Sequence, residues 1–212
     1  MVGPLSLVIG NRIEAMARIA RPLPFLLGCL LALTPVSGHA EDSKYYVPPS
    51  RFVASVQVTG ESVKPISGVF EEATGSFSYD DEAFIISRVR LAINAQSLKP
   101  AKPSHEKGLK NLFNNDMSSE ITFASTAPAT VKDGSAEIKG TLTVLGQGKP
   151  AALKATFANK EPHGASLPLS LTGSFKRDDY GIEESAETET APDGSRVVDT
   201  ITLTFDLQSL RM

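Results

Sequence analysis

The fold class is decided by the stretch Glu137-Ile138-Lys139-Gly140-Thr141-Leu142-Thr143-Val144, which is followed by Leu145-Gly146-Gln147-Gly148. Apolar residues or glycine occupy every second position from Ile138 to Val144, and polar residues occupy the positions between them. This alternation is typical of a strand with one buried face, because successive strand side chains point to opposite faces. The Gly-Gln-Gly segment that follows predicts a turn. The stretch therefore predicts a strand that enters a hairpin, with Leu142 and Val144 directed toward a core.

The same alternation recurs along most of the chain, at residues 52–58, 89–93, 153–157, 167–171 and 201–207, with shorter candidates at 66–70, 73–79 and 121–125. Turn residues separate these segments at Asp80-Asp81, Asp133-Gly134, His163-Gly164 and Asp193-Gly194. Because no helical crossover lies between most of them, we expect antiparallel pairing. The pattern predicts one all-β domain of about eight or nine strands, arranged as a barrel or a sandwich.

One short helix is expected at residues 104–114. Ser104 is a candidate N-cap, and Leu109, Leu112 and Phe113 fall on one helical face. Pro100 and a second proline at position 103 precede this segment as breakers.

The N-terminal forty residues predict a cleaved signal peptide. Arg12, Arg18 and Arg21 form a basic segment, residues 25–33 form a short apolar run, and Gly38-His39-Ala40 fits the cleavage rule. The domain is then residues 41–212, and translation from either Met1 or Met16 is compatible with the pattern. Cys29 also resembles a lipoprotein cysteine, but the bulky residue two positions before it and the apolar run after it argue against lipidation.

Cleavage after Ala40 leaves 18 basic and 23 acidic residues, a net charge of −5. Without a basic stripe, the charge pattern argues against nucleic acid as a partner. Cys29, the only cysteine, leaves with the signal peptide. The mature chain therefore has no disulfide, and its stability depends on a packed core.

The order of several motifs resembles the YceI-like family of polyisoprenoid-binding periplasmic proteins, from Tyr46 to Leu210. The motifs are Ile66-Ser67-Gly68-Val69-Phe70, Gly75-Ser76-Phe77-Ser78-Tyr79-Asp80, the hairpin at residues 140–150, and Phe175-Lys176-Arg177-Asp178-Asp179-Tyr180-Gly181-Ile182. This resemblance implies a lipocalin-like antiparallel β-barrel of about eight strands, located in the periplasm, with an apolar lumen for a long lipid. The chain departs from the family pattern at His105-Glu106, Glu120 and Lys149, positions that bear on head-group recognition.

Fifteen residues are expected to bind the ligand, because they fall on the predicted inward faces or at the mouth of the lumen. They are Phe52, Phe70, Phe77, Leu91, Ile93, Leu112, Phe113, Phe123, Leu142, Val144, Leu169, Phe175, Arg177, Leu203 and Phe205. Gly68, Gly75, Gly140 and Gly173 lie on or near these faces and either leave room for a ligand or relieve strain in bent strands. Without the resemblance, the same apolar faces favour a packed core over a cavity.

Arg177 has two interpretations: a clamp for a polar head group at the mouth, or a member of an internal ion pair with Asp178 or Asp179. The sequence predicts no catalytic residue, no metal site and no cofactor. His105 beside Glu106 has no third partner to orient it, and His163 reads as a turn residue.

We therefore expect a carrier or scavenger of an isoprenoid or fatty lipid in the periplasm. The alternatives are a ligand-free structural or stress-associated module and an enzyme acting on a lipid head group. Transient membrane contact and homodimer formation stay open.

Overall fold

The computed structural model describes residues 43–60, 65–109, 112–113, 119–182 and 200–212. The expected signal peptide and the Asp193-Gly194 turn lie outside these ranges. In the described part of the chain, no helix has the length and apolar character needed to cross a membrane.

The described chain is built from strands joined by turns and a few single-turn helices. In chain order these are β1 (Ser43–Val47), η1 (Pro49–Arg51), β2 (Phe52–Thr59), β3 (Ile66–Phe70), β4 (Ala73–Asp80), β5 (Ile85–Asn94), η2 (Ala95–Ser97), β6 (Leu98–Pro100), η3 (Pro103–His105), α1 (Glu106–Leu109), β7 (Glu120–Ser125), β8 (Ala129–Thr130), β9 (Ser135–Val144), β10 (Gln147–Phe157), β11 (Pro168–Lys176), η4 (Arg177–Tyr180), β12 (Thr200–Gln208) and β13 (Leu210–Arg211).

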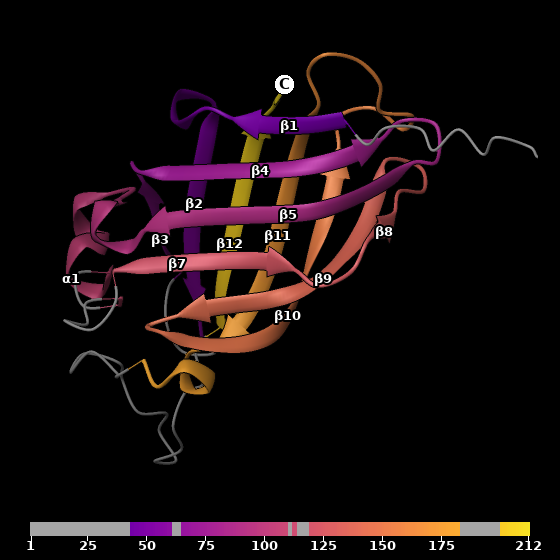
Figure 1. The fold of residues 1–212 in the computed structure, drawn as a ribbon. Helices are drawn as coiled ribbons and strands as arrows, with labels where there is room; N and C mark the ends of the chain where they lie inside the picture. The colour runs from indigo at the N-terminus through magenta and orange to yellow at the C-terminus, as the bar shows by residue number, and fades with distance from the viewer. Residues whose placement is uncertain (1–42, 61–64, 110–111, 114–118, 183–199) are drawn as a thin grey trace, which may run out of the picture. The chain divides into compact units, whose positions relative to one another are not determined.

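All strands belong to one antiparallel sheet with the order β13-β1-β4-β5-β7-β9-β10-β11-β12-β2-β3-β6, and β8 pairs with β5. The sheet curls so strongly that β1, β4, β5 and β7 run across β2, β11 and β12 (Figure 1). The space between these two sets of strands is called the interior below. The prediction of an all-β antiparallel fold is confirmed.

The prediction of a barrel of about eight strands is wrong in number and in closure. The sheet has thirteen strands, and its path through the described residues does not return to its start, so the sheet forms a half-barrel. The additional strands β1, β6, β8 and β13 are two to five residues long. Strands of two or three residues carry too few alternating positions to be recognised from the sequence, and in β1 the consecutive Tyr45, Tyr46 and Val47 break the alternation.

A sharp corner between β3 and β4 produces much of the curl. Only Glu71 and Glu72 separate the two strands, yet β3 pairs with β2 and β6, whereas β4 pairs with β1 and β5. Ser97 stabilises this corner, because its Oγ accepts a hydrogen bond from the Glu72 N–H at 3.0 Å and donates to the Asn94 carbonyl at 2.6 Å. The chain therefore passes from one side of the interior to the other within two residues.

The β9–β10 hairpin turns at Leu145 and Gly146, both at positive φ (50° and 76°). The predicted turn at 146–148 is one residue late, since Gln147 already pairs with Val144. The predicted Asp133-Gly134 turn is confirmed, with φ of 49° and 72°. Two positive φ values in succession match the primed two-residue turns that join twisted hairpins.

The helix expected at residues 104–114 is much shorter in its described part. A 3-10 turn begins at Pro103, and only Glu106–Leu109 is α-helical. Ser104 lies inside the 3-10 turn, and the residue at the N-cap is Lys102, without a side-chain cap. The Ser104 cap prediction is therefore wrong, because proline starts the turn one residue before it.

Candidate ligand-binding interior

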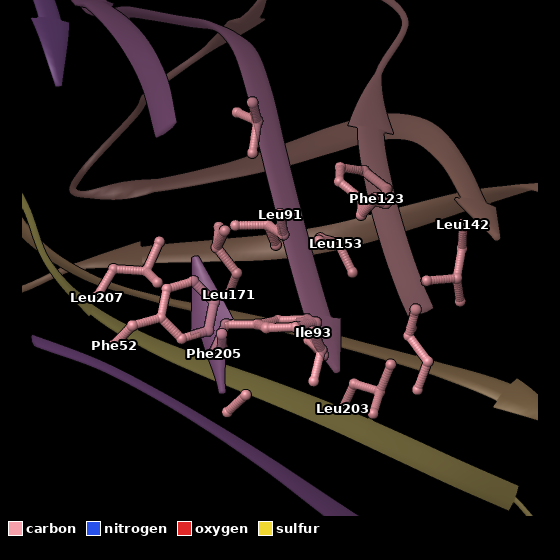
Figure 2. Close-up of a cluster of buried hydrophobic side chains, with 14 of the residues drawn as sticks. Phe52, Leu91, Ile93, Phe123, Leu142, Leu153, Leu171, Leu203, Phe205 and Leu207 are labelled. Carbon is pink, nitrogen blue, oxygen red and sulfur yellow. The ribbon is translucent and has the colours of Figure 1, made fainter. Parts of the chain in front are cut away.

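The structure brings the fifteen predicted residues together around one interior. All are buried, from Val144 at 0% to Phe175 at 9% exposed. Figure 2 shows Leu91 and Phe123, which are paired neighbours on β5 and β7, in one cluster with Phe205 of β12. Among the described buried residues, Arg177 is the one charged side chain, and the other buried polar residues are serines. The interior is therefore a continuous apolar volume with a single cationic group.

This interior is filled by its own side chains. A residue that lines a void wide enough for water keeps accessible surface on that side, and Leu91, Phe123 and Leu142 keep only 1–3%. Phe52 and Phe205 pack edge to face, with ring centroids 6.1 Å apart. Protein interiors reach the density of organic crystals in this way. A ligand that enters the interior must displace side chains.

The glycines on the inward faces serve this close packing. A Cβ on Gly140 would lie 2.5 Å from a Phe123 ring atom, and one on Gly173 would lie 2.4 Å from Leu153. At Gly75 the ring of Phe52 comes within 2.9 Å of the same point. The volume that these glycines free is occupied by neighbouring side chains, so the interpretation that it is open to a ligand is wrong for this conformation.

One end of the interior, the sealed end, is closed by hydrogen bonds. It is formed by the end of β4, the start of β11, the end of β12 and the loop at residues 158–167. The Ser209 hydroxyl donates to the Leu167 carbonyl at 2.8 Å and accepts from the Leu167 N–H at 3.2 Å. The Arg211 N–H donates to the Ala165 carbonyl at 2.8 Å. The backbone of the loop is thus hydrogen-bonded to the Ser209 side chain and to the Arg211 backbone at the C-terminal end of the chain.

Two tyrosines line the sealed end. Tyr45 stacks on Phe77 with ring centroids 5.2 Å apart, and its hydroxyl donates to the Gly164 carbonyl at 2.9 Å. Tyr79 packs against Phe157 at 5.5 Å, and its hydroxyl is buried without a hydrogen-bond partner among the described residues. The pKa of Tyr79 is raised to about 12, mainly by burial and in smaller part by the nearby Asp81 carboxylate.

The opposite end, the capped end, is covered by α1 and by η4. On the α1 side, Leu109, Leu112 and Phe113 are buried, and the Phe113 ring lies 6.0 Å from that of Phe70. The Ser67 N–H donates to His105 Nδ1 at 3.1 Å, which joins the start of α1 to β3. A single helical turn, one hydrogen bond to a histidine ring and apolar packing therefore hold this cover.

On the η4 side, Tyr180 attaches the chain to the β9–β10 hairpin. Its hydroxyl donates to the Leu142 carbonyl at 3.2 Å, and its ring packs edge to face on Phe175 at 4.9 Å. Arg177 is 4% exposed and is engaged within the chain, whereas Asp178 and Asp179 are exposed. Gly181 ends the turn at a φ of 62°, which favours glycine.

A half-open hollow of ≈ 380 Å³ lies beside α1 at the capped end. Leu98, Leu109 and Phe113 form its apolar lining, and Lys99 and Glu106 contribute charged groups. Leu109 and Phe113 are also members of the buried core, so the hollow borders the interior through these core side chains. A larger hollow of ≈ 600 Å³ is lined by residues that include Glu71, Glu72 and Asn94. Its lining contains no tyrosine and no residue of η4.

The two histidines of the domain have packing roles. His105 contacts the Ser67 backbone, and the His163 ring packs edge to face on Phe84 at 5.5 Å. Within the described ranges, no group of three or more histidine, cysteine, aspartate or glutamate residues is arranged to hold a metal ion. Neither histidine is brought to a polar cluster suited to acid–base chemistry.

Comparison with known proteins places this interior in context. The YceI-like domain matches residues 45–209, which is most of the chain. The chain belongs to the YceI-like family. The predicted resemblance is therefore confirmed.

The YceI-like chain is 32% identical over 123 residues to a UPF0312 protein of Vibrio cholerae; the match covers 56% of this chain and 65% of the relative, so it spans less than two thirds of that protein's length. A UPF0312 protein of Shewanella putrefaciens is 28% identical over 168 residues, with 76% of this chain and 86% of the relative covered.

Two solved structures share the fold. BcnA of Burkholderia cenocepacia has a TM-score of 0.62 at 19% identity and covers 76% of this chain and 98% of its own. A polyisoprenoid binding domain from Saccharophagus degradans, implicated in plant cell wall breakdown, has a TM-score of 0.50 at 14% identity and covers 79% and 98%.

Sequence reasoning did not include Tyr79 or Ser209 in the site of this YceI-like chain. The alternation that places Phe77 inward also places Tyr79 inward, and that signal was available in residues 73–79. Ser209 follows the last alternating residue of β12, and nothing in the sequence indicates its contact with Leu167, 42 positions away. Tyr46, next to Tyr45 on β1, is 41% exposed.

Proposed function

We propose that this YceI-like chain binds a long apolar lipid, an isoprenoid or a fatty amphiphile, in the interior and carries or sequesters it in the periplasm. The observation that carries the proposal is the continuous apolar interior, in which Arg177 is the one charged side chain among the described buried residues. The fold shared with a polyisoprenoid binding domain supports an isoprenoid ligand.

Affinity in this mechanism comes from enclosure. Each buried methylene contributes about 0.8 kcal/mol, which is about a fourfold change in affinity, so a long tail binds well without many polar contacts. Part of this gain is used to displace the side chains that fill the interior. We expect displacement at the capped end, because α1 is one turn long and its apolar residues separate the hollow from the interior.

A packed interior also favours a second candidate function. The low exposure of Leu91, Phe123 and Leu142 equally suits a structural module whose core is never occupied by a ligand. The two candidates differ in what happens when the interior is overfilled. A carrier loses its ligand, whereas a structural module has no ligand to lose.

The experiment introduces tryptophan at Leu142, which faces the interior from β9. Overpacking costs typically about 1–3 kcal/mol of folding free energy, and we expect Leu142→Trp to keep its β-sheet circular dichroism but to lose lipid retention. Lys139→Trp, on the exposed face of the same strand, is the matched control and should retain lipid. Equal lipid retention by both variants would contradict binding in the interior. Leu91→Trp repeats the test from β5, which lies two strands away from β9 in the sheet, with β7 between them.

A chain-length series tests the source of the affinity. If enclosure dominates, each methylene removed from the tail should weaken binding about fourfold, until the tail no longer reaches across the interior. An affinity that does not depend on tail length would exclude the enclosure mechanism.

A further inference from the structure

Tyr79 lies at the sealed end of the interior and differs from the other buried tyrosines. It is 1% exposed, it extends from the inward face of β4, and its ring packs on Phe157. Its hydroxyl has no hydrogen-bond partner among the described residues, whereas the hydroxyls of Tyr45 and Tyr180 donate to the carbonyls of Gly164 and Leu142. Tyr79 is thus the one buried tyrosine in the described chain whose hydrogen-bonding capacity is unused.

An unused buried hydroxyl is unfavourable. Leaving a donor without a partner costs about 1–3 kcal/mol, and a phenylalanine would fill the same space beside Phe157 without that cost. A hydroxyl at this point is therefore explained best by a partner other than the described residues.

The surroundings of the Tyr79 hydroxyl define the chemistry of that partner. The hydroxyl stays protonated, because its burial and the carboxylates of Asp80 and Asp81 raise its pKa to about 12. It is then a hydrogen-bond donor and needs an acceptor atom. The same carboxylates oppose a second negative charge, so a neutral oxygen fits better than a phosphate or a carboxylate.

The distance along β4 fits a ligand that lies along the interior. Tyr79 is six positions from Ala73 at the other end of the strand, which is about 20 Å at 3.3 Å per residue. Arg177, the other polar group of the interior, belongs to η4 at the capped end and is engaged within the chain. Of these two groups, Tyr79 is the one that lacks a partner in the described chain.

We propose that the Tyr79 hydroxyl binds a neutral carbonyl or hydroxyl oxygen of the lipid, so that the ligand lies with its oxygen-bearing head toward the sealed end and its tail toward α1 and η4. This inference rests on the proposed lipid-binding function and adds to it a head-group class and an orientation. It places the head of a neutral lipid away from Arg177, which the sequence allowed as a head-group clamp or as a member of an internal ion pair.

The test uses geranylgeranylacetone, a prenyl lipid with one ketone, and follows its carbonyl stretch by infrared difference spectroscopy. In the parent protein we expect a shift to lower frequency, because the carbonyl accepts a hydrogen bond. In Tyr79→Phe the shift should disappear, and affinity should fall about three- to tenfold, which corresponds to one neutral hydrogen bond. Phytane, a hydrocarbon without an acceptor, should bind parent and variant equally.

Tyr180→Phe is the matched control, since it removes a buried hydroxyl that is already bonded to a carbonyl of the chain. It should leave the carbonyl shift unchanged. A shift that persists in Tyr79→Phe would overturn the head-group assignment while leaving lipid binding intact. Failure of the parent to bind either probe would overturn both the proposed function and this inference.

Discussion

The two ends of the interior are closed by different means. At the sealed end, Ser209 and Tyr45 bond to the backbone of the 158–167 loop, and the Arg211 N–H adds a further hydrogen bond. At the capped end, apolar side chains beside a one-turn helix cover the interior. Its hydrogen bonds include one to the His105 ring, one from the Tyr180 hydroxyl and one from the Gln147 side chain to the Tyr180 carbonyl. The sealed end resists opening through several directional bonds. Under the proposed function, we expect the capped end to open by exchanging one set of apolar contacts for another, which a lipid tail can supply.

The comparison predicts its largest effect for leucine-to-alanine substitutions. Leu167→Ala, at 2% exposure under the sealed end, should lower the free energy of unfolding by about 2–5 kcal/mol and leave lipid exchange unchanged. Leu109→Ala at the capped end should lower the free energy of unfolding by about 2 kcal/mol or less, because neighbouring side chains can close the space that it leaves. The same substitution should speed lipid exchange. Denaturant unfolding and lipid transfer to vesicles measure the two properties. Faster exchange in Leu167→Ala alone would reverse the assignment of the ends.

Two buried serines provide a smaller and more closely matched comparison. Ser209 bonds both backbone groups of Leu167. Ser97 bonds the backbone of Glu72 and Asn94, and its neighbours Gln96 and Leu98 line the ≈ 380 Å³ hollow. We expect Ser209→Ala and Ser97→Ala each to lower stability by about 1–3 kcal/mol, because each leaves backbone groups without partners. Lipid exchange should quicken only in Ser97→Ala, which loosens the wall of the ≈ 380 Å³ hollow at the capped end. Equal exchange rates in both variants would remove the distinction between the ends.

The smallest effect concerns alkaline pH at the sealed end. The pKa of Tyr79 is raised in the folded state from 10 to about 12, so the unfolded chain loses this proton first and the free energy of unfolding falls as pH rises from 10 toward 12. The parent protein should therefore lose more stability than Tyr79→Phe over this interval. Urea unfolding at pH 9 and pH 11 measures the difference, and parallel losses in both proteins would show that the phenol of Tyr79 is not desolvated.

The inward faces could be predicted from the sequence, and the packing between them could not. Alternation alone placed Leu91, Leu142 and Phe205 inward, because a strand has a strict two-residue period. Whether these faces enclose a void depends on contacts between distant segments, such as Phe123 filling the space beside Gly140. No local pattern contains that information.

The corner between β3 and β4 and the bend in the β4–β5 pair could not be predicted from the sequence either. The chain changes sides at Glu71-Glu72 without glycine or proline, and the β4–β5 pairing shifts register between Ser76 and Ser78. Opposite this shift, Arg88 has a φ of 51°, and its Nε donates to Ser78 Oγ at 3.0 Å. Such bulges bend strands. Residues 76–78 and 87–90, which form this one, include no glycine or proline, so the sequence does not predict it.

The central claim, that the interior holds a long apolar lipid, is tested most directly by native mass spectrometry of the protein isolated from the cells that produce it. The account predicts a mass in excess of the polypeptide, released on unfolding as an intact lipid, and absent from Leu142→Trp but present in Lys139→Trp. A polypeptide mass without excess, for protein isolated under conditions that keep lipids bound to other carriers, would contradict the claim and favour the structural module.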